Sequence, residues 1–161
     1  MAELLVDAYL TEHGDRPGPM EPTFKYLACA QLRLFLIGGH DTTSSALVYT
    51  YHLLYENPGP LARLRAEHDE ALGEDIAEAG ARISADPTLL NKLPYTNACI
   101  KETMRIFPPA SAMRVGTPDI VLTDRNGTQY PTAGCNVWSL HLAMHRSPKL
   151  FKEPRSFIPE R

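Results

Sequence analysis

The sequence predicts a mainly α-helical protein with a small β-sheet. Residues 23–56 keep helical character over a long run, and residues 2–13 and 60–72 place apolar side chains at helical spacing. Residues 119–140 are instead rich in β-branched side chains around an Asn-Gly pair, which is typical of a hairpin. With 161 residues, 43% hydrophobic and 22% charged, the chain has the composition of one globular domain over residues 1–161.

The first two predicted helices are separated by a loop. The helix over residues 2–13 is expected to end where residues 14–19 (GDRPGP) bring in glycine and proline. The second helix is predicted from Thr23 to Glu56, and the Asn-Pro-Gly-Pro sequence at residues 57–60 stops it.

Two shorter helices are predicted after this stop. Residues 60–72 form the first, and Gly73 supplies its C-terminal end. Residues 74–87 are polar and are expected to form a loop. Pro94 opens the next helix, which the proline pair at residues 108–109 terminates.

The C-terminal part of the chain is predicted to hold the sheet and an irregular segment. Asn126-Gly127 lies where a tight type I′ hairpin turn requires positive φ. Residues 145–161 are rich in proline and charged side chains and are predicted to be mostly irregular. A short helix can form only at residues 148–151.

Charge and cysteine content exclude several classes of protein. The formal net charge is -3 without any Lys/Arg block, so nucleic acid is not an expected partner. Cys29, Cys99 and Cys135 are odd in number and lack CxxC spacing, which indicates neither a disulfide framework nor a zinc site. A reducing, cytosol-facing environment is expected.

The apolar stretch at residues 24–37 does not predict a membrane span. Lys25 and Arg33 interrupt it, and it is too short to cross a bilayer. No signal peptide opens the sequence, so we expect no membrane anchor in this chain.

The helix predicted over residues 23–56 is too long for a compact domain of this size. It would measure about 50 Å at 1.5 Å per residue, whereas a globule of this length has a diameter of about 40 Å. Its residues are also apolar nearly all round, as in a helix that crosses a larger protein. We therefore expect neighbours outside this chain; the alternative is a bent helix in a small bundle.

The middle of this helix holds poor helix formers at residues 38–45 (GGHDTTSS). Each glycine costs about 1 kcal/mol relative to alanine, and threonine and serine compete for backbone carbonyls one turn back. One interpretation is a bulge or widened turn, where the missing side chains of Gly38 and Gly39 let a flat ligand approach the backbone. The alternative is close packing of another helix against the two glycines.

Two further clusters carry charge. Glu102 and Arg105 stand three apart on one face of a helix, where they can form an ion pair. Pro159-Glu160-Arg161 adds a second arginine. Taken separately, neither cluster predicts a function.

Together and in this order, the three stretches resemble the cytochrome P-450 superfamily of heme-thiolate monooxygenases. Residues 38–43 (GGHDTT) fit its A/G-G-x-D/E-T-T/S signature, residues 102–105 (ETMR) its E-x-x-R helix, and residues 157–161 (FIPER) its F-x-P-E-R segment. The similarity extends from about Leu34 onward and is most like that of fungal members of the secondary-metabolism or fatty-acid type. It implies a partial P-450 fold with a long central helix, an E-x-x-R helix and a β-hairpin.

The resemblance implies roles for individual residues. Asp41 and Thr42 would be the catalytic acid–alcohol pair that delivers protons during cleavage of the O–O bond, with His40 a bystander. Gly38 and Gly39 would let dioxygen and the helix approach the heme, so that they contact the cofactor together with Thr42. Residues that bind a metal directly are not implied.

Other residues would hold the cofactor or the fold. Arg114 would pair with a heme propionate; its alternative is an ordinary surface arginine on a strand. Glu102, Arg105 and Arg161 would form a structural charge triad, and residues 110–112 would line the substrate pocket.

The family's cofactors and partners follow from the same resemblance. A complete enzyme would bind heme b, receive electrons from NADPH through a reductase, and oxidise an apolar small molecule with dioxygen at the cytosolic face of the endoplasmic reticulum membrane. The family's heme-ligating cysteine lies in an F-x-x-G-x-R-x-C-x-G loop that this sequence does not contain. We therefore expect an internal fragment that also lacks the N-terminal part, is inactive alone, and buries Cys29, Cys99 and Cys135 as small apolar residues.

Two alternatives remain open at this stage. One is a non-catalytic truncated gene product. The other is a metal-dependent phosphohydrolase, because the adjacent His40 and Asp41 are similar to the His-Asp doublet of that class. The remaining histidines show no spacing typical of metal ligands: His13, His52, His68, His141 and His145.

Overall fold

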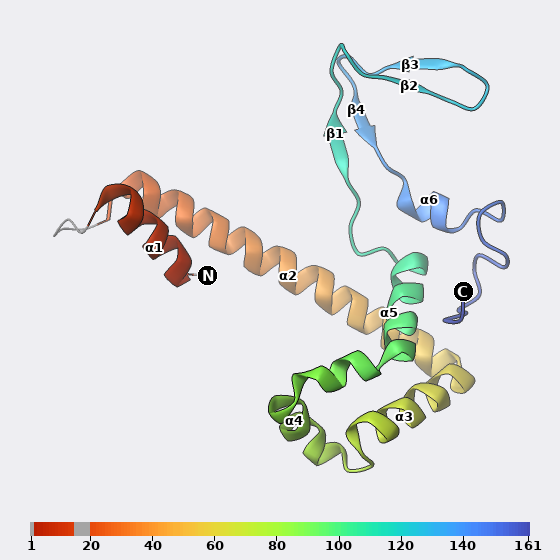
Figure 1. Ribbon diagram of the computed structural model, residues 1–161. Coiled ribbons are helices and arrows are strands. Elements are labelled where there is room, and N and C mark those ends of the chain that lie inside the picture. Colours follow the sequence, from red (N-terminus) through yellow and green to blue (C-terminus); the bar gives the residue numbers. More distant parts are fainter. Residues whose placement is uncertain (1, 15–19) are drawn as a thin grey trace. The chain divides into compact units, whose positions relative to one another are not determined.

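The computed structural model describes residues 2–14 and 20–161 (Figure 1). The predicted loop at residues 14–19 therefore lies outside the described residues except for Gly14. The chain divides into two compact units, Met1–Ser44 and Ser45–Arg161. The boundary falls inside the long helix, and each unit is described by itself.

The first unit contains helix α1 (Ala2–His13) and the start of helix α2 (Pro22–Glu56), which confirms both predicted helices. Gly14 ends α1 with φ of 71°, and its N–H donates to the Leu10 carbonyl at 2.8 Å. Before α2, the Glu21 carboxylate accepts hydrogen bonds from the amides of Thr23 and Phe24 at 3.0 and 2.8 Å. This carboxylate satisfies amides that have no partner within the helix.

Helix α2 is α-helical throughout residues 38–45, so the predicted bulge or widened turn is wrong. The hydroxyl of Thr42 donates to the Gly38 carbonyl at 2.6 Å, and that of Ser44 donates to the His40 carbonyl at 2.6 Å. These bonds reach one turn back, as expected for such residues. They are accommodated within the helix without opening it.

The core of the second unit lies between α2, α3 (Pro58–Leu72) and α5 (Pro94–Ile106). Helix α3 contacts α5, and Gly73 closes α3 with φ of 86° and an N–H bonded to the Asp69 carbonyl at 2.9 Å. Both helices match their predicted ranges closely. The buried apolar cluster consists of Leu54, Leu64, Tyr95, Cys99, Ile106 and Phe157.

The loop predicted at residues 74–87 is largely helical, so that prediction is wrong. Helix α4 covers Ile76–Ala85, and a 3₁₀ helix, η1, covers Pro87–Lys92. Asp75 caps α4 by accepting from the Ala77 amide at 2.9 Å, and Asp86 caps η1 by accepting from the Thr88 amide at 3.0 Å. Asp75 and Asp86, which the sequence analysis places in a loop, are therefore helix caps.

The β-structure consists of two antiparallel pairs rather than one small sheet. Strand β1 (Met113–Val115) pairs with β4 (Asn136–Trp138), and β2 (Val121–Thr123) pairs with β3 (Gln129–Pro131). The inner pair forms the predicted hairpin.

The turn of this hairpin is not the predicted type I′. Gly127 has φ of 83°, but Asn126 does not have a positive φ, and the Gly127 amide donates to the Asp124 carbonyl at 3.1 Å. The Asp124 carboxylate accepts from the amides of Asn126 and Thr128 at 2.8 and 2.9 Å. This longer turn, closed by a left-handed glycine, replaces the two-residue turn because the aspartate side chain satisfies its amides.

Helix α6 (His141–His145) precedes the irregular segment. The short helix thus lies earlier than the predicted residues 148–151, which form turns. Within the described ranges, no helix is both long and apolar enough to span a membrane.

Candidate functional site

Helix α5 presents Glu102 and Arg105 on one face, and they form a two-pronged ion pair. Arg105 Nε donates to Glu102 Oε2 at 2.7 Å, and Arg105 Nη2 donates to Oε1 at 2.9 Å. The side chains are 4% exposed for Glu102 and 8% for Arg105. Such parallel bonds between planar groups are the strong form of this interaction.

Arg161 joins the same carboxylate from a distant part of the chain. Its Nε donates to Glu102 Oε1 at 3.0 Å, and the amide of Ile158 donates to the same oxygen at 3.0 Å. Burial alone would raise the pKa of Glu102, but hydrogen bonds from Arg105, Ile158 and Arg161 outweigh it and lower that pKa. The structure thus brings together Glu102, Arg105 and Arg161 around an ionised carboxylate.

The remaining donors of the two arginines bind backbone carbonyls at the end of α6 and in the irregular segment that follows it. Arg105 Nη1 donates to two carbonyls at 2.7 and 2.8 Å, and Arg161 Nη2 donates to one at 2.7 Å. This segment lacks a regular hydrogen-bond ladder, so the guanidinium groups satisfy acceptors that would otherwise need water. The carbonyls bound by the two arginines belong to His145, Lys152, Glu153, Pro154 and Ser156.

Asp41 and Thr42 are adjacent on α2, and no hydrogen bond joins their two side chains, both of which the structure describes. The Thr42 hydroxyl donates to Gly38. Asp41 Oδ1 lies 3.1 Å from His40 Nδ1, and these side chains are 74% and 80% exposed. His40 is therefore in contact with the predicted acid.

The face of α2 at Gly38 and Gly39 is open. A Cβ atom added at either glycine would meet nothing within 4 Å outside the helix itself. Within the described residues of the unit Met1–Ser44, no other helix packs closely against this pair. The open backbone fits the approach of a flat ligand such as a porphyrin.

Arg114 lies on β1 and is exposed. Its Nη1 donates to the Met113 carbonyl at 2.9 Å, and no ion pair joins it to a carboxylate of the described ranges. The guanidinium is therefore available to an anionic group such as a propionate.

A cavity of about 580 Å³ in the second unit includes part of the predicted substrate-pocket segment. Ala110 and Ser111 line it, whereas Ala112 does not. Its wall includes Tyr49 of α2 stacked on Phe107, with ring centroids 4.2 Å apart. Aromatic and proline side chains make this cavity suitable for apolar molecules.

The three cysteines differ in exposure. Cys99 is fully buried, and burial raises the pKa of its thiol to about 11. Cys29 and Cys135 are exposed, so the prediction that they are buried is wrong. A heme thiolate must be deprotonated and accessible to iron. Cys99 does not fit this role, and the other two lie outside any glycine-rich loop of the family type.

Sequence reasoning missed Glu67 on α3. Its carboxylate accepts from the amides of Tyr95 and Thr96 at 2.6 and 2.8 Å and from the Thr96 hydroxyl at 2.7 Å. It thereby caps the start of α5, where Leu93 provides no side-chain cap. Because the pairing joins residues 28 apart, no local pattern could have indicated it.

Metal-ligating side chains do not gather in groups of three or more His, Cys, Asp or Glu within residues 2–14 and 20–161. The His-Asp doublet at His40 and Asp41 thus stands without further ligands in that part of the chain.

Comparison with known proteins identifies a family. A family model described as "Cytochrome P450" matches residues 4–161, almost the whole chain. It covers the GGHDTT, ETMR and FIPER stretches together.

Curated relatives agree with this match. The chain is 38% identical to "Cytochrome P450 monooxygenase polC" of Polytolypa hystricis over 100% of this chain and 29% of that protein. It is 37% identical to "Cytochrome P450 monooxygenase acrF" of Aspergillus aculeatus over 86% of this chain and 28% of that protein. It is 36% identical to "Cyclooctat-9-en-7-ol 5-monooxygenase" of Streptomyces melanosporofaciens over 81% of this chain and 26% of that protein. The chain thus spans less than a third of the length of these relatives.

Solved structures show the same fold. Two zebrafish cytochrome P450 structures, with progesterone and with abiraterone, match at TM-scores of 0.57 and 0.62 and 24% identity. The matches cover 99% of this chain and 40% and 41% of those chains.

Proposed function

The chain belongs to the cytochrome P450 family, and we propose that residues 1–161 are a partial domain of a heme-dependent monooxygenase. The complete enzyme would oxidise an apolar organic substrate with dioxygen, in the secondary metabolism of a fungus. The observation that carries this proposal is the family match over residues 4–161 in a chain whose α2 combines Asp41 and Thr42 with an open glycine face.

Membership in the family implies heme as the cofactor, and bound heme supplies the activation of dioxygen. Gly38 and Gly39 would lie against its face, and Arg114 would bind one of its carboxylates. These residues fit the group because the glycine backbone is open and the guanidinium has no carboxylate partner among the described residues.

Asp41 and Thr42 would deliver protons to the oxygen-binding side. A carboxylate and a hydroxyl one residue apart can relay protons through water. In the described geometry Thr42 bonds to the Gly38 carbonyl and Asp41 contacts His40. The relay therefore requires the Thr42 hydroxyl to turn from that carbonyl toward a water molecule.

Glu102, Arg105 and Arg161 would have a structural role, since their charged atoms are occupied with one another and with backbone carbonyls. Electrons would come from NADPH through a reductase. By the same resemblance, the complete enzyme would act at the cytosolic face of the endoplasmic reticulum membrane.

A second candidate function is that residues 1–161 alone are non-catalytic. The burial and sequence context of the three cysteines favour it. Cys99 is buried with a raised pKa, and Cys29 and Cys135 lack the family's loop. The test is the reduced carbon monoxide difference spectrum of the purified chain with added heme. We expect no absorption band typical of thiolate-bound heme. A clear band of that kind would overturn the inference that none of the three cysteines binds heme iron.

The monooxygenase proposal itself is tested in a complete enzyme built around residues 1–161, with the other segments taken from a curated relative. That enzyme should show the thiolate-type band and form an oxidised product. A folded, heme-loaded enzyme without turnover of any apolar substrate of the relative would contradict the proposal.

A further inference from the structure

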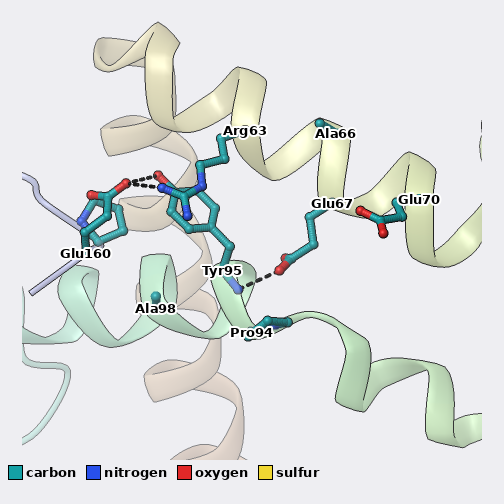
Figure 2. Close-up of a pocket in the computed structure, with 9 residues that line it drawn as sticks. Arg63, Ala66, Glu67, Glu70, Pro94, Tyr95, Ala98 and Glu160 are labelled. Atoms are coloured by element: carbon teal, nitrogen blue, oxygen red, sulfur yellow. Dashed lines mark hydrogen bonds and ion pairs between the residues drawn. The ribbon is translucent and has the colours of Figure 1, made fainter.

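Glu160 and Arg161 are adjacent, yet their side chains bind different partners. Arg161 Nε donates to Glu102. Glu160 Oε1 instead accepts from Arg63 Nη1 of α3 at 2.9 Å and from the Tyr95 hydroxyl of α5 at 3.0 Å (Figure 2). This stretch of backbone therefore has two separate polar attachments to the helices.

Tyr95 is the buried member of the second attachment. Its side chain belongs to the apolar core and is 8% exposed. The Arg63 guanidinium lies over its ring at 4.2 Å from the centroid, a cation–π arrangement. Burial and the hydrogen bond to Glu160 raise the pKa of Tyr95 to about 12, so the phenol stays protonated and donates its hydrogen bond.

The backbone from Phe157 to Arg161 has no regular secondary structure to fix it. Phe157 is buried in the core and holds one end. Beyond Phe157, the amide of Ile158 bonds to Glu102 and Pro159 is buried, and the remaining contacts that hold the chain are made by the side chains of Glu160 and Arg161. Glu160 supplies such contacts directly before the residue that pairs with Glu102.

We propose that the side chains of Arg63, Tyr95 and Glu160 form a second anchor for this backbone. The anchor positions Arg161 for its ion pair with Glu102. Tyr95 and Glu160 are thus positioning residues that act through Arg161. The anchor needs no heme, so its test is separate from that of the proposed function.

The two contacts of Glu160 differ in expected strength. The Arg63 and Glu160 side chains are 61% and 47% exposed, and ion pairs between such exposed groups contribute little. The Tyr95 hydroxyl is partly buried and bonds to a charged acceptor, which is the stronger type of hydrogen bond. Tyr95→Phe, which removes only the hydroxyl, is therefore the more informative variant.

Hydrogen exchange of the Ile158 amide reports whether this backbone stays in place at Glu102, because the amide donates at 3.0 Å to the same Glu102 Oε1 that Arg161 binds. In the purified chain we expect Tyr95→Phe and Glu160→Gln to accelerate its exchange by about tenfold, the effect of losing one hydrogen bond to a charged group. Amides in the middle of α5 should keep their parental rates. Glu70→Gln is the matched control, since Glu70 lines the same pocket as Arg63, Tyr95 and Glu160 (Figure 2) but its carboxylate has no hydrogen bond or ion pair among the described residues.

Alkaline titration of Tyr95, followed by NMR of the labelled ring because the chain has seven tyrosines, provides the second readout. Glu160→Gln should lower the pKa of Tyr95 from about 12, because the negative charge that disfavours the phenolate is removed. Unchanged Ile158 exchange in a variant with this lowered pKa would overturn the proposal. Equal acceleration at Ile158 and throughout α5 would also overturn it, because that result indicates a general loss of stability instead of positioning.

Discussion

Arg161 donates from Nε to Oε1 of Glu102 at 3.0 Å across 59 residues of sequence. This bond ties an irregular segment to the middle of α5. Arg105 completes the cluster from one turn further along the same helix. The only strongly buried carboxylate of the described residues is therefore surrounded by two guanidinium groups and one amide.

Replacing Glu102 by Gln should destabilise the chain by about 3–5 kcal/mol, because the buried Arg105 and the partly buried Arg161 lose their counter-charge. The measurement is chemical denaturation of the purified chain. Glu78→Gln is the control: its pair with Arg82 is solvent-exposed, so its loss should cost less than about 1 kcal/mol. Equal effects of the two substitutions would show that burial of the cluster does not matter.

Stability should fall in acid with a contribution specific to Glu102. The folded-state pKa of Glu102 is lowered from its usual 4.5, so the unfolded chain takes up the proton first as pH falls. The stabilisation is present above about pH 4.5 and is lost as pH drops toward the folded-state pKa, with a slope of up to about 1.4 kcal/mol per pH unit.

The pH dependence is checked by denaturation between neutral pH and acid. In Glu102→Gln the slope below pH 4.5 should be smaller, since the remaining carboxylates with lowered pKa are common to both proteins. Identical slopes would mean that Glu102 has the same pKa in both states. The shared carboxylates are Glu67, Asp86, Asp119 and Asp124.

Removing the cap that Glu67 provides should weaken α5 at its start. Glu67→Ala is expected to cost about 1 kcal/mol, the usual effect of losing a helix cap, and to accelerate amide exchange at Tyr95 and Thr96. Glu70→Ala on the same helix is the comparison. If both variants behave alike, the three bonds to Glu67 do not hold α5.

The thiols should react at very different rates. Cys29 and Cys135 are exposed, whereas Cys99 has no exposed surface and a pKa raised to about 11. Iodoacetamide should therefore modify the first two in the native chain and Cys99 only after unfolding. Peptide mass spectrometry reads each site separately, and rapid native labelling of Cys99 would contradict the burial.

Proline and glycine marked the ends of most predicted helices, whereas α4 and η1, which begin at the aspartate caps Asp75 and Asp86, were not predicted even though η1 opens on Pro87. Proline marks the start of α3 and α5, and both were predicted closely. Helix α4 was missed because Asp75 and its polar neighbours are equally common in loops and at helix starts. The hairpin was found, but its turn was wrong because the carboxylate of Asp124 determines it.

The candidate site divides in a similar way. Family motifs located Glu102, Arg105 and Arg161, since each lies in a recognisable short pattern. The contacts of Tyr95 with Glu160 and of Glu67 with Thr96 join residues 65 and 29 apart in isolated positions. The packing of α3 on α5 brings Glu67 to Thr96, and the return of the irregular segment to α5 brings Glu160 to Tyr95.

The central claim is that Thr42 delivers protons for oxygen activation. It is tested most directly by the coupling between NADPH consumption and product formation in the complete enzyme built around residues 1–161. Thr43 is the adjacent control, because it has the same side chain but falls outside the matching position. Thr42→Ala should lower the rate of product formation by roughly 10²-fold, as loss of a positioned proton donor does, and divert NADPH electrons to hydrogen peroxide. Thr43→Ala should keep parental coupling; equal coupling in the two variants would contradict the role of Thr42.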